Sequence, residues 1–144
     1  MRRRVVILDD HALIRHNLWH YFDGRGYEVF TFPEPRLCPL HAVQACPCPG
    51  ETRCADLIIS DLDMWGKNGI DCIESLMEKG CKLRNFALMS GYFSDADLAR
   101  ASIIGCALFT KPFSMDAFAA WVEQVERAIP PGRVLHDWLQ ISSD

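Results

Sequence analysis

Four short apolar segments of the sequence each end in a group that can do polar chemistry. In chain order, the residues at or just after these ends are Asp9 and Asp10, then Asp61 with Asp63, then Ser90, and then Lys111. Clustered carboxylates repel one another unless a cation lies among them, and Mg²⁺ favours carboxylate oxygens together with water and phosphate oxygens. A lysine and a hydroxyl can hold the other oxygens of a phosphoryl group carried on one carboxylate. The residue types therefore point to an aspartyl phosphate formed with Mg²⁺.

These residues meet only if the elements before them form one sheet. The hydrophobic patterns predict strands over residues 5–8, 27–32, 57–60, 86–89 and 107–110. They predict helices over residues 12–22 and 71–79, a helix from the cap at Ser94 to Ile104, and a last helix capped by Ser114. Alternating strands and helices indicate a parallel sheet covered on both faces, and ligands bind beyond the carboxyl ends of such strands. Short helical pieces around residues 40–45 and 134–141 are also expected.

The motifs at the strand ends resemble those of the receiver domains of bacterial response regulators. They are the segments 5–10, 57–64, 87–91 and 108–113, and the resemblance covers roughly residues 4–128. It implies an α/β, flavodoxin-like (βα)5 fold, a doubly wound parallel sheet with strand order 2-1-3-4-5. A receiver domain would span residues 1–129, with a cysteine-rich insertion at about 36–55, and residues 130–144 would form a C-terminal tail.

The resemblance also assigns roles by position. Asp61 matches the phosphoacceptor, Asp9 and Asp10 the acidic pair that binds Mg²⁺, Asp63 a backbone carbonyl ligand, Ser90 the hydroxyl that turns to the phosphoryl group, and Lys111 the conserved-type lysine, with a bond to Pro112 that is often cis in this family. Two positions depart from the family pattern. Trp65 occupies a position that is usually proline, and Leu108 replaces the usual switch aromatic.

The function implied by this resemblance is a phosphorylation-dependent switch rather than an enzyme. A sensor histidine kinase or a phosphotransfer protein would donate the phosphoryl group to Asp61. The face formed by the fourth strand, fourth helix and fifth strand would then shift population and act on a downstream protein target. Turnover beyond slow self-dephosphorylation is not expected, and the chain is expected to be a monomer or a weak dimer.

Composition narrows the functional classes further. The chain has 144 residues, enough for one domain, and a formal net charge of −4 without the clustered basic surface that nucleic-acid binding needs. No apolar run is long enough to span a membrane, and the short segment after Arg2–Arg4 is broken by acids, unlike a signal peptide. A cytoplasmic protein without membrane or nucleic-acid partners is therefore expected.

The seven cysteines have no explanation in the receiver resemblance. A second metal site is one hypothesis, holding Zn²⁺ or an iron–sulfur cluster, and its candidate ligands are Cys38, His41, Cys46, Cys48 and Cys54. The alternative is free thiols, or one disulfide, in a solvent-exposed loop. Cys72, Cys81 and Cys106 lie in or beside regular elements and are expected to be packed thiols.

Two other functions fit part of the pattern. Asp61 and Asp63 resemble the DxD motif of haloacid-dehalogenase-type phosphatases, which also form an aspartyl phosphate with Mg²⁺. That motif comes first in those enzymes, and a second acidic pair comes late, whereas here Asp9 and Asp10 come before it. A metal or redox sensor acting through the cysteines, with a vestigial aspartate site, is the other alternative.

Overall fold

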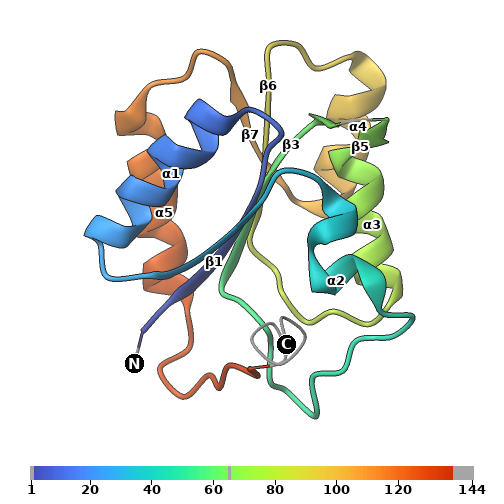
Figure 1. Cartoon of the computed structure of the whole chain (residues 1–144), viewed down its shortest axis with the longest axis vertical. Coiled ribbons are helices and arrows are strands. Elements are labelled where there is room, and N and C mark those ends of the chain that lie inside the picture. Colours follow the sequence, from blue (N-terminus) through green and yellow to red (C-terminus); the bar gives the residue numbers. More distant parts are fainter. Residues whose placement is uncertain (1, 65, 138–144) are drawn as a thin grey trace.

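The computed structural model describes residues 2–64 and 66–137, and its centre is a five-stranded parallel sheet (Figure 1). The strands are β1 (Arg4–Leu8), β2 (Glu28–Phe32), β3 (Leu57–Asp61), β6 (Phe86–Ser90) and β7 (Ala107–Thr110). Their order is β2-β1-β3-β6-β7, with every neighbouring pair parallel. This arrangement confirms the predicted strand order 2-1-3-4-5.

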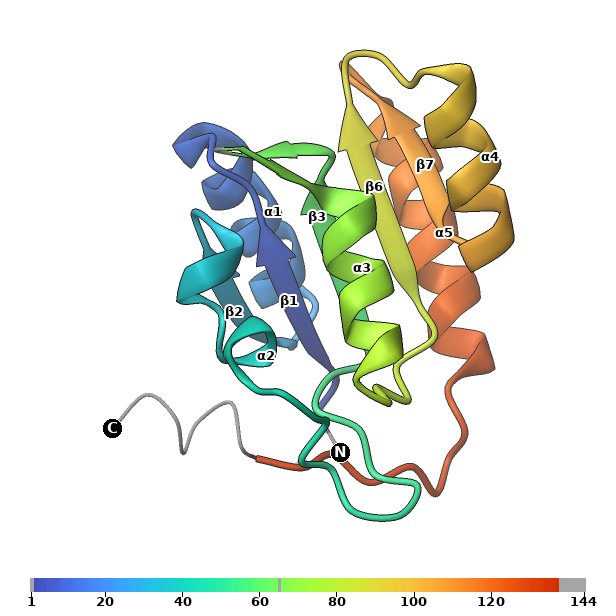
Figure 2. The ribbon, with the colours of Figure 1, turned by 90° about the vertical axis from the view of Figure 1, so that its right-hand side faces the viewer.

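Helices cover both faces of the sheet. Helices α1 (Ala12–Gly24) and α5 (Met115–Ala128) lie on one face. On the other face lie α2 (Pro39–Ala42), α3 (Gly69–Glu78) and α4 (Asp95–Ile104), with a short 3₁₀ turn, η1 (Pro35–Leu37), before α2. Figure 2 shows the same layers from the side, with α3 in front of the sheet and α1 behind it. The predicted helix positions are confirmed to within a few residues at each end.

The central strands are apolar on both faces because helices cover both. In β1, Val5 and Ile7 pack with α1 and α5, whereas Val6 and Leu8 pack with α2 and α3. All five residues of β1, β3 and β6 are buried. Buried runs of this kind are typical of parallel strands, and they explain why the sequence shows continuous rather than alternating hydrophobicity.

Local capping fixes the start of the two last helices. The Ser94 side chain accepts from the backbone N–H of Asp97, and the Asp97 side chain accepts from the backbone N–H of Ser94, a capping box. The Ser114 side chain caps α5 by accepting from the backbone N–H groups of Asp116 and Ala117. Helix α4 ends at Gly105, whose φ of 86° lies in the left-handed region. These boundaries confirm the predictions made from Ser94, Gly105 and Ser114.

The C-terminal segment returns to the sheet instead of forming a helix. After α5 the chain turns at Pro131 and Gly132, and Leu135 forms a parallel bridge with Arg53. The predicted helical piece over 134–141 is therefore wrong for residues 134–137, because this segment pairs with a backbone distant in sequence. Residues 138–141 lie outside the described residues. Among the described helices, none has the length and hydrophobicity to cross a bilayer.

Candidate functional site

The carboxyl ends of β1 and β3 bring three acidic side chains together. These strands are neighbours, with Leu8 opposite Ser60, so the residues that follow them meet at one edge of the sheet. Asp9, Asp10 and Asp61 each offer a carboxylate oxygen, and these oxygens all lie within 4.8 Å of one another. The aspartates expected to form one acidic cluster are thus grouped by the fold.

Lys111 supplies the positive charge of this cluster from the end of β7. Its Nζ lies 3.1 Å from Asp61 Oδ1 and 3.5 Å from Asp9 Oδ2. The backbone N–H of Lys111 donates to the Ser90 carbonyl oxygen at 2.7 Å, which ties the start of this loop to β6. The peptide bond between Lys111 and Pro112 is cis, as the resemblance implied.

Burial shapes the electrostatics of the two inner carboxylates. Desolvation raises the pKa of Asp61 to about 6, against the opposing hydrogen bond from Lys111 and with a further rise from the charge of Asp9. Desolvation also raises the pKa of Asp9, although the backbone N–H of His11 bonds to its Oδ1 at 2.8 Å. Both carboxylates would be more stable as anions with more positive charge beside them.

One carboxylate oxygen of the cluster has an ion-pair partner but no hydrogen bond. Asp9 Oδ2 is buried, forms no hydrogen bond with the described residues, and lies 3.5 Å from the Lys111 ammonium. One ammonium beside three carboxylates leaves the cluster with excess negative charge. This donor set fits a hard divalent cation such as Mg²⁺.

Ser90 and Asp63 stand differently from the other predicted site residues. The Ser90 hydroxyl donates to the Tyr92 carbonyl oxygen at 2.7 Å, so in this structure it serves the loop after β6 rather than Asp61. Asp63 opens β4 (Asp63–Met64), which pairs antiparallel with β5 (Lys67–Asn68), and its side chain is exposed. An exposed side chain is compatible with a role for the backbone carbonyl alone.

Gly69 is a positioning residue that the sequence reasoning missed. A Cβ added there would lie 2.4 Å from the backbone oxygen of Asp61 and 3.1 Å from Ser60 Oγ. The Gly69 N–H also donates to the Leu62 carbonyl oxygen at 2.6 Å. The start of α3 can approach the end of β3 this closely only because residue 69 lacks a side chain. The signal available in the sequence was a lone glycine opening a helix eight residues after Asp61, where helix propensity disfavours glycine.

Of the two residues that depart from the family pattern, Leu108 and Trp65, the structure describes only Leu108. Leu108 lies opposite Leu88 and is partly buried against the core on the α3 and α4 side. It therefore acts as a packed aliphatic residue between β7 and α4. Trp65 lies outside the described residues.

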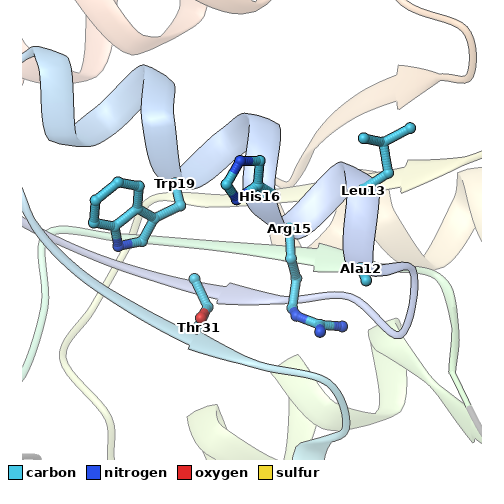
Figure 3. A pocket seen from close by; sticks show the side chains of 6 residues that line it. All are labelled: Ala12, Leu13, Arg15, His16, Trp19 and Thr31. Atoms are coloured by element: carbon cyan, nitrogen blue, oxygen red, sulfur yellow. The ribbon is translucent and has the colours of Figure 1, made fainter.

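A hollow of about 560 Å³ adjoins the acidic site on the α1 side (Figure 3). Its lining residues are Ala12, Leu13, Arg15, His16, Trp19 and Thr31. Arg15 connects the hollow to the site, because its Nη1 donates to the Asp9 carbonyl oxygen at 2.8 Å. The lining contains no carboxylate, so the acidic cluster lies at the strand ends and not in this hollow.

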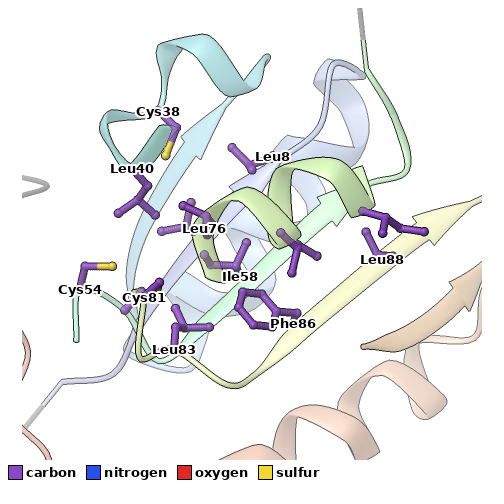
Figure 4. Packing of buried hydrophobic residues seen from close by; sticks show 14 of the residues in the cluster. Leu8, Cys38, Leu40, Cys54, Ile58, Leu76, Cys81, Leu83, Phe86 and Leu88 are labelled. Carbon is purple, nitrogen blue, oxygen red and sulfur yellow. The ribbon is translucent and has the colours of Figure 1, made fainter. Parts of the chain in front are cut away.

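The cysteines of the insertion are packed rather than exposed. Cys38, Cys48 and Cys54 are buried in the core on the α3 side, and all seven cysteines are free thiols. The alternative of free thiols in a solvent-exposed loop is thus correct for the free thiols and wrong for the burial of these three cysteines, whereas much of the loop between them is exposed. In Figure 4, Cys38 lies beside Leu40, apart from Cys54 and Cys81.

The five predicted metal ligands fall into two groups. Cys38 is the N-cap of α2, and His41 lies in this helix. Burial is the main cause that raises the pKa of Cys38 and lowers the pKa of His41, and the nearby charges on them come from Cys72, Lys79 and Lys67. The other three, Cys46, Cys48 and Cys54, contact one another through their sulfurs, and Cys81 joins them. Cys81 was expected only to be a packed thiol.

Thiol-to-thiol hydrogen bonds separate the acidities of this second group. Donation from Cys54 lowers the pKa of Cys48 to about 6 and that of Cys81 to about 7. The same bonds, with burial, raise the pKa of Cys54. Burial also raises the pKa of Cys46.

Several solved structures with this architecture are receiver proteins or receiver domains. CheY4 of Vibrio cholerae superposes with a TM-score of 0.68 at 23% identity, over 87% of this chain and 99% of that one. A response regulator receiver protein from Pseudomonas putida gives 0.70 at 20% identity, over 86% and 98%. The receiver domain of an HD-domain protein from Pseudomonas fluorescens gives 0.71 at 16% identity, over 89% and 97%.

The chain has the CheY-like receiver fold. No protein-family model and no curated protein matches the sequence. The fold is therefore shared with receivers at identities that leave the site residues to be judged on their own geometry. In this receiver fold, Asp9, Asp10, Asp61 and Lys111 come together at the carboxyl ends of the strands, where ligands of doubly wound sheets bind.

Proposed function

We propose that this chain is a phosphorylation-dependent signalling switch of the two-component type. Asp61 would accept a phosphoryl group from a sensor histidine kinase or a phosphotransfer protein. The observation that carries the proposal is the grouping of Asp9, Asp10 and Asp61 within 4.8 Å, with the Lys111 ammonium 3.1 Å from Asp61. An ammonium beside a carboxylate nucleophile suits the acceptance of a phosphoryl group once a cation offsets the charge of the three acids.

Asp9, Asp10 and Asp61 would hold the Mg²⁺ that this chemistry needs, together with the backbone carbonyl of Asp63. Bound there, Mg²⁺ would neutralise the acidic cluster and the phosphoryl oxygens, which lowers the repulsion between donor and acceptor. The charge balance supports this assignment, because three carboxylates face a single ammonium, and the buried Asp9 Oδ2 has only an ion pair and no hydrogen bond among the described residues.

In the proposed transfer, Asp61 is the nucleophile and the imidazole of the donor histidine is the leaving group. A carboxylate oxygen of Asp61 forms a bond to phosphorus while the bond between phosphorus and the donor's imidazole nitrogen breaks, and that nitrogen keeps the electron pair. Lys111 already bonds to Asp61 and is placed to follow the transferred group by pairing with a phosphoryl oxygen. Asp61 must be ionised to attack, and Lys111 favours that form.

Ser90 would transmit the change to the output face. Its hydroxyl now bonds to the Tyr92 carbonyl, so turning toward a phosphoryl group would release the loop between β6 and α4. Helix α4 presents the exposed apolar side chains Leu98 and Ile103, and Tyr92 is exposed beside it. A shift in this loop would change the surface offered to a downstream protein.

Intact mass under native conditions tests the proposal. With Mg²⁺ and acetyl phosphate, the wild-type chain is expected to gain one phosphoryl group, and Asp61→Asn is expected to gain none. Asp23→Asn is the matched control, because this exposed acid lies at the far end of α1. A wild-type chain that gains no phosphoryl group with Mg²⁺ present would overturn the assignment.

The same sample tests the phosphatase alternative. A haloacid-dehalogenase-like enzyme would release phosphate from simple phosphate esters in repeated turnovers, whereas a switch holds its single phosphoryl group. Among the described residues, the acidic cluster contains no member later in the chain than Asp61. This favours the switch, and steady ester hydrolysis that Asp61→Asn abolishes would favour the phosphatase.

A further inference from the structure

Four thiols gather at the amino-terminal end of the sheet, opposite the acidic cluster. Cys46 contacts Cys48, Cys48 contacts Cys54, and Cys54 contacts Cys81, through their side chains. Cys54 precedes β3 and Cys81 follows α3, so the group joins the insertion to the loop that enters β6. None of the four forms a disulfide.

A small cavity lies beside these sulfurs. Its volume is about 10 Å³, room for about one water-sized particle. Cys46, Cys54 and Cys81 line it, and most of the other lining residues are apolar, such as Leu40 and Leu76. A site of this size with several thiols and few other polar groups suits a single soft or borderline cation better than an organic ligand.

Backbone donors already point at two of the sulfurs. The Cys48 N–H donates to the Cys46 sulfur, and the Leu83 N–H donates to the Cys81 sulfur. Such bonds orient a sulfur and stabilise its anionic form, which is the form that ligates metals. Cys106, on which only burial acts, has no such donors, whereas Cys38 receives two from the start of α2.

Two cations flank the same group. Lys82 Nζ donates to the Cys48 carbonyl oxygen at 2.8 Å, and Arg84 Nη1 donates to the Cys81 carbonyl oxygen at 3.1 Å. A divalent cation with four thiolates carries a net charge of −2, which these side chains would offset. Lys82 and Arg84 therefore lie where they could compensate the negative charge of a metal-bound thiolate site.

We propose that Cys46, Cys48, Cys54 and Cys81 bind one Zn²⁺ ion in a structural four-thiolate site. In the structure the four sulfurs form a connected chain, and among the described residues only the aspartates bring three ligand atoms within 4.8 Å of one another. The ion must therefore draw the two ends of the chain, Cys46 and Cys81, together. The backbones of both residues are tied to the end of α3, because the Cys46 N–H donates to the Lys79 carbonyl oxygen and the Cys81 N–H to the Leu76 carbonyl oxygen. Rotation of the cysteine side chains would therefore bring the sulfurs together.

This site differs from the ligand set expected from the sequence, and it does not depend on the proposed phosphorylation. Cys38 and His41 are excluded from it, and Cys81 replaces them. Cobalt absorption tests for this site directly. Co²⁺ bound by several thiolates shows a near-ultraviolet charge-transfer band, and Co²⁺ bound by carboxylates lacks it. Reduced, metal-free full-length chain is expected to develop this band with one equivalent of Co²⁺ and to lose it when Zn²⁺ is added.

The variants assign the ligands. Cys54→Ser and Cys81→Ser are expected to lose the charge-transfer band, whereas Cys38→Ala, Cys106→Ser and Asp61→Asn are expected to keep it. Circular dichroism confirms that each variant is folded. The proposal is overturned if the reduced wild type shows no charge-transfer band, or if folded Cys81→Ser retains it. An intact mass that shows a disulfide in unreduced protein, with no cobalt band after reduction, would overturn it in favour of a redox pair.

Discussion

At the scale of single residues, Lys111 has two opposed effects on the acidic cluster. Its ammonium lies 3.1 Å from Asp61 and 3.5 Å from Asp9, so it stabilises the carboxylates that a metal would also bind. The same charge repels a divalent cation, yet it favours a phosphoryl group once that group is in place. Loss of Lys111 should therefore separate metal binding from phosphorylation.

Lys111→Met is expected to tighten Mg²⁺ binding by up to about tenfold, or ~1.4 kcal/mol. It is expected to slow phosphorylation by acetyl phosphate by on the order of 100-fold, because a preplaced positive charge is lost from the transition state. Isothermal titration calorimetry measures the first effect, and time-resolved intact mass measures the second. Lys82→Met, at the opposite end of the sheet, is the control. Weaker Mg²⁺ binding in Lys111→Met would contradict this account.

Gly69 offers a second test at the same scale. In Gly69→Ala the new Cβ would meet the Asp61 carbonyl oxygen at 2.4 Å, and a backbone atom cannot rotate away. We expect a loss of about 2 kcal/mol in the free energy of unfolding from this overpacking, with slower phosphorylation because Asp61 is displaced. Gly24→Ala is the matched control, since nothing lies within 4 Å of its added Cβ. Equal stability of the two variants in urea unfolding would refute the close approach.

At the scale of elements, the sequence correctly predicted the ends of helices and the grouping of residues that follow neighbouring strands. Helix α4 was predicted from Ser94, Asp97 and Gly105 because a capping box and a left-handed stop act within a few residues. The grouping of Asp9 with Asp61 was predicted because strand ends of a parallel sheet share one edge. Both inferences needed the order of elements but no detail of packing.

Tertiary contacts account for what the sequence did not predict. The close approach at Gly69 depends on where α3 crosses β3, and the contact of Cys81 with Cys54 depends on how the insertion folds over α3. The cysteine spacing in the chain contains neither fact. Leu135 was expected to be helical from its neighbours, but its partner is Arg53. In each case the deciding partner lies far away in sequence.

Helix α2 carries a pH-dependent element of stability at His41. Burial, with the charges of Lys79 and Lys67, lowers the pKa of this histidine to about 4 from its ordinary 6.5. Below pH 6.5 the unfolded chain takes up a proton that the folded chain excludes down to about pH 4. His41 therefore removes stability as the pH falls through this window, and it has no such effect above it.

Chemical unfolding at two pH values tests this assignment. Between pH 7.5 and pH 5 the wild type is expected to lose about 2 kcal/mol more stability than His41→Asn. The measurement uses metal-free protein, so that the acidic cluster contributes equally to both chains. His16→Asn, which changes an exposed histidine of α1, should behave as the wild type does. The same pH dependence in His41→Asn and wild type would mean that another group causes the loss.

At the scale of the whole molecule, a buried ionic network attaches the C-terminal segment to the sheet. Asp56, which enters β3, is fully buried and accepts from Arg133 Nε at 2.6 Å and Nη2 at 2.7 Å. It also accepts from the backbone N–H of Arg4 at 3.0 Å, and the Arg4 guanidinium donates to the carbonyls of Cys54 and His136. The start of β1, the approach to β3 and the final segment thus share one set of charges.

Removing one partner of such a network is costly because it leaves a buried charge without compensation. Arg133→Met is expected to lower the free energy of unfolding by about 3 kcal/mol, whereas Arg127→Met, an exposed residue of α5, should change it little. The double variant Asp56→Asn/Arg133→Met should recover part of the loss, since the uncompensated carboxylate is then gone. If Arg133→Met matched Arg127→Met in urea unfolding, the final segment would contribute no stability. If the double variant were the sum of its single changes, the two side chains would not be coupled as the structure shows them.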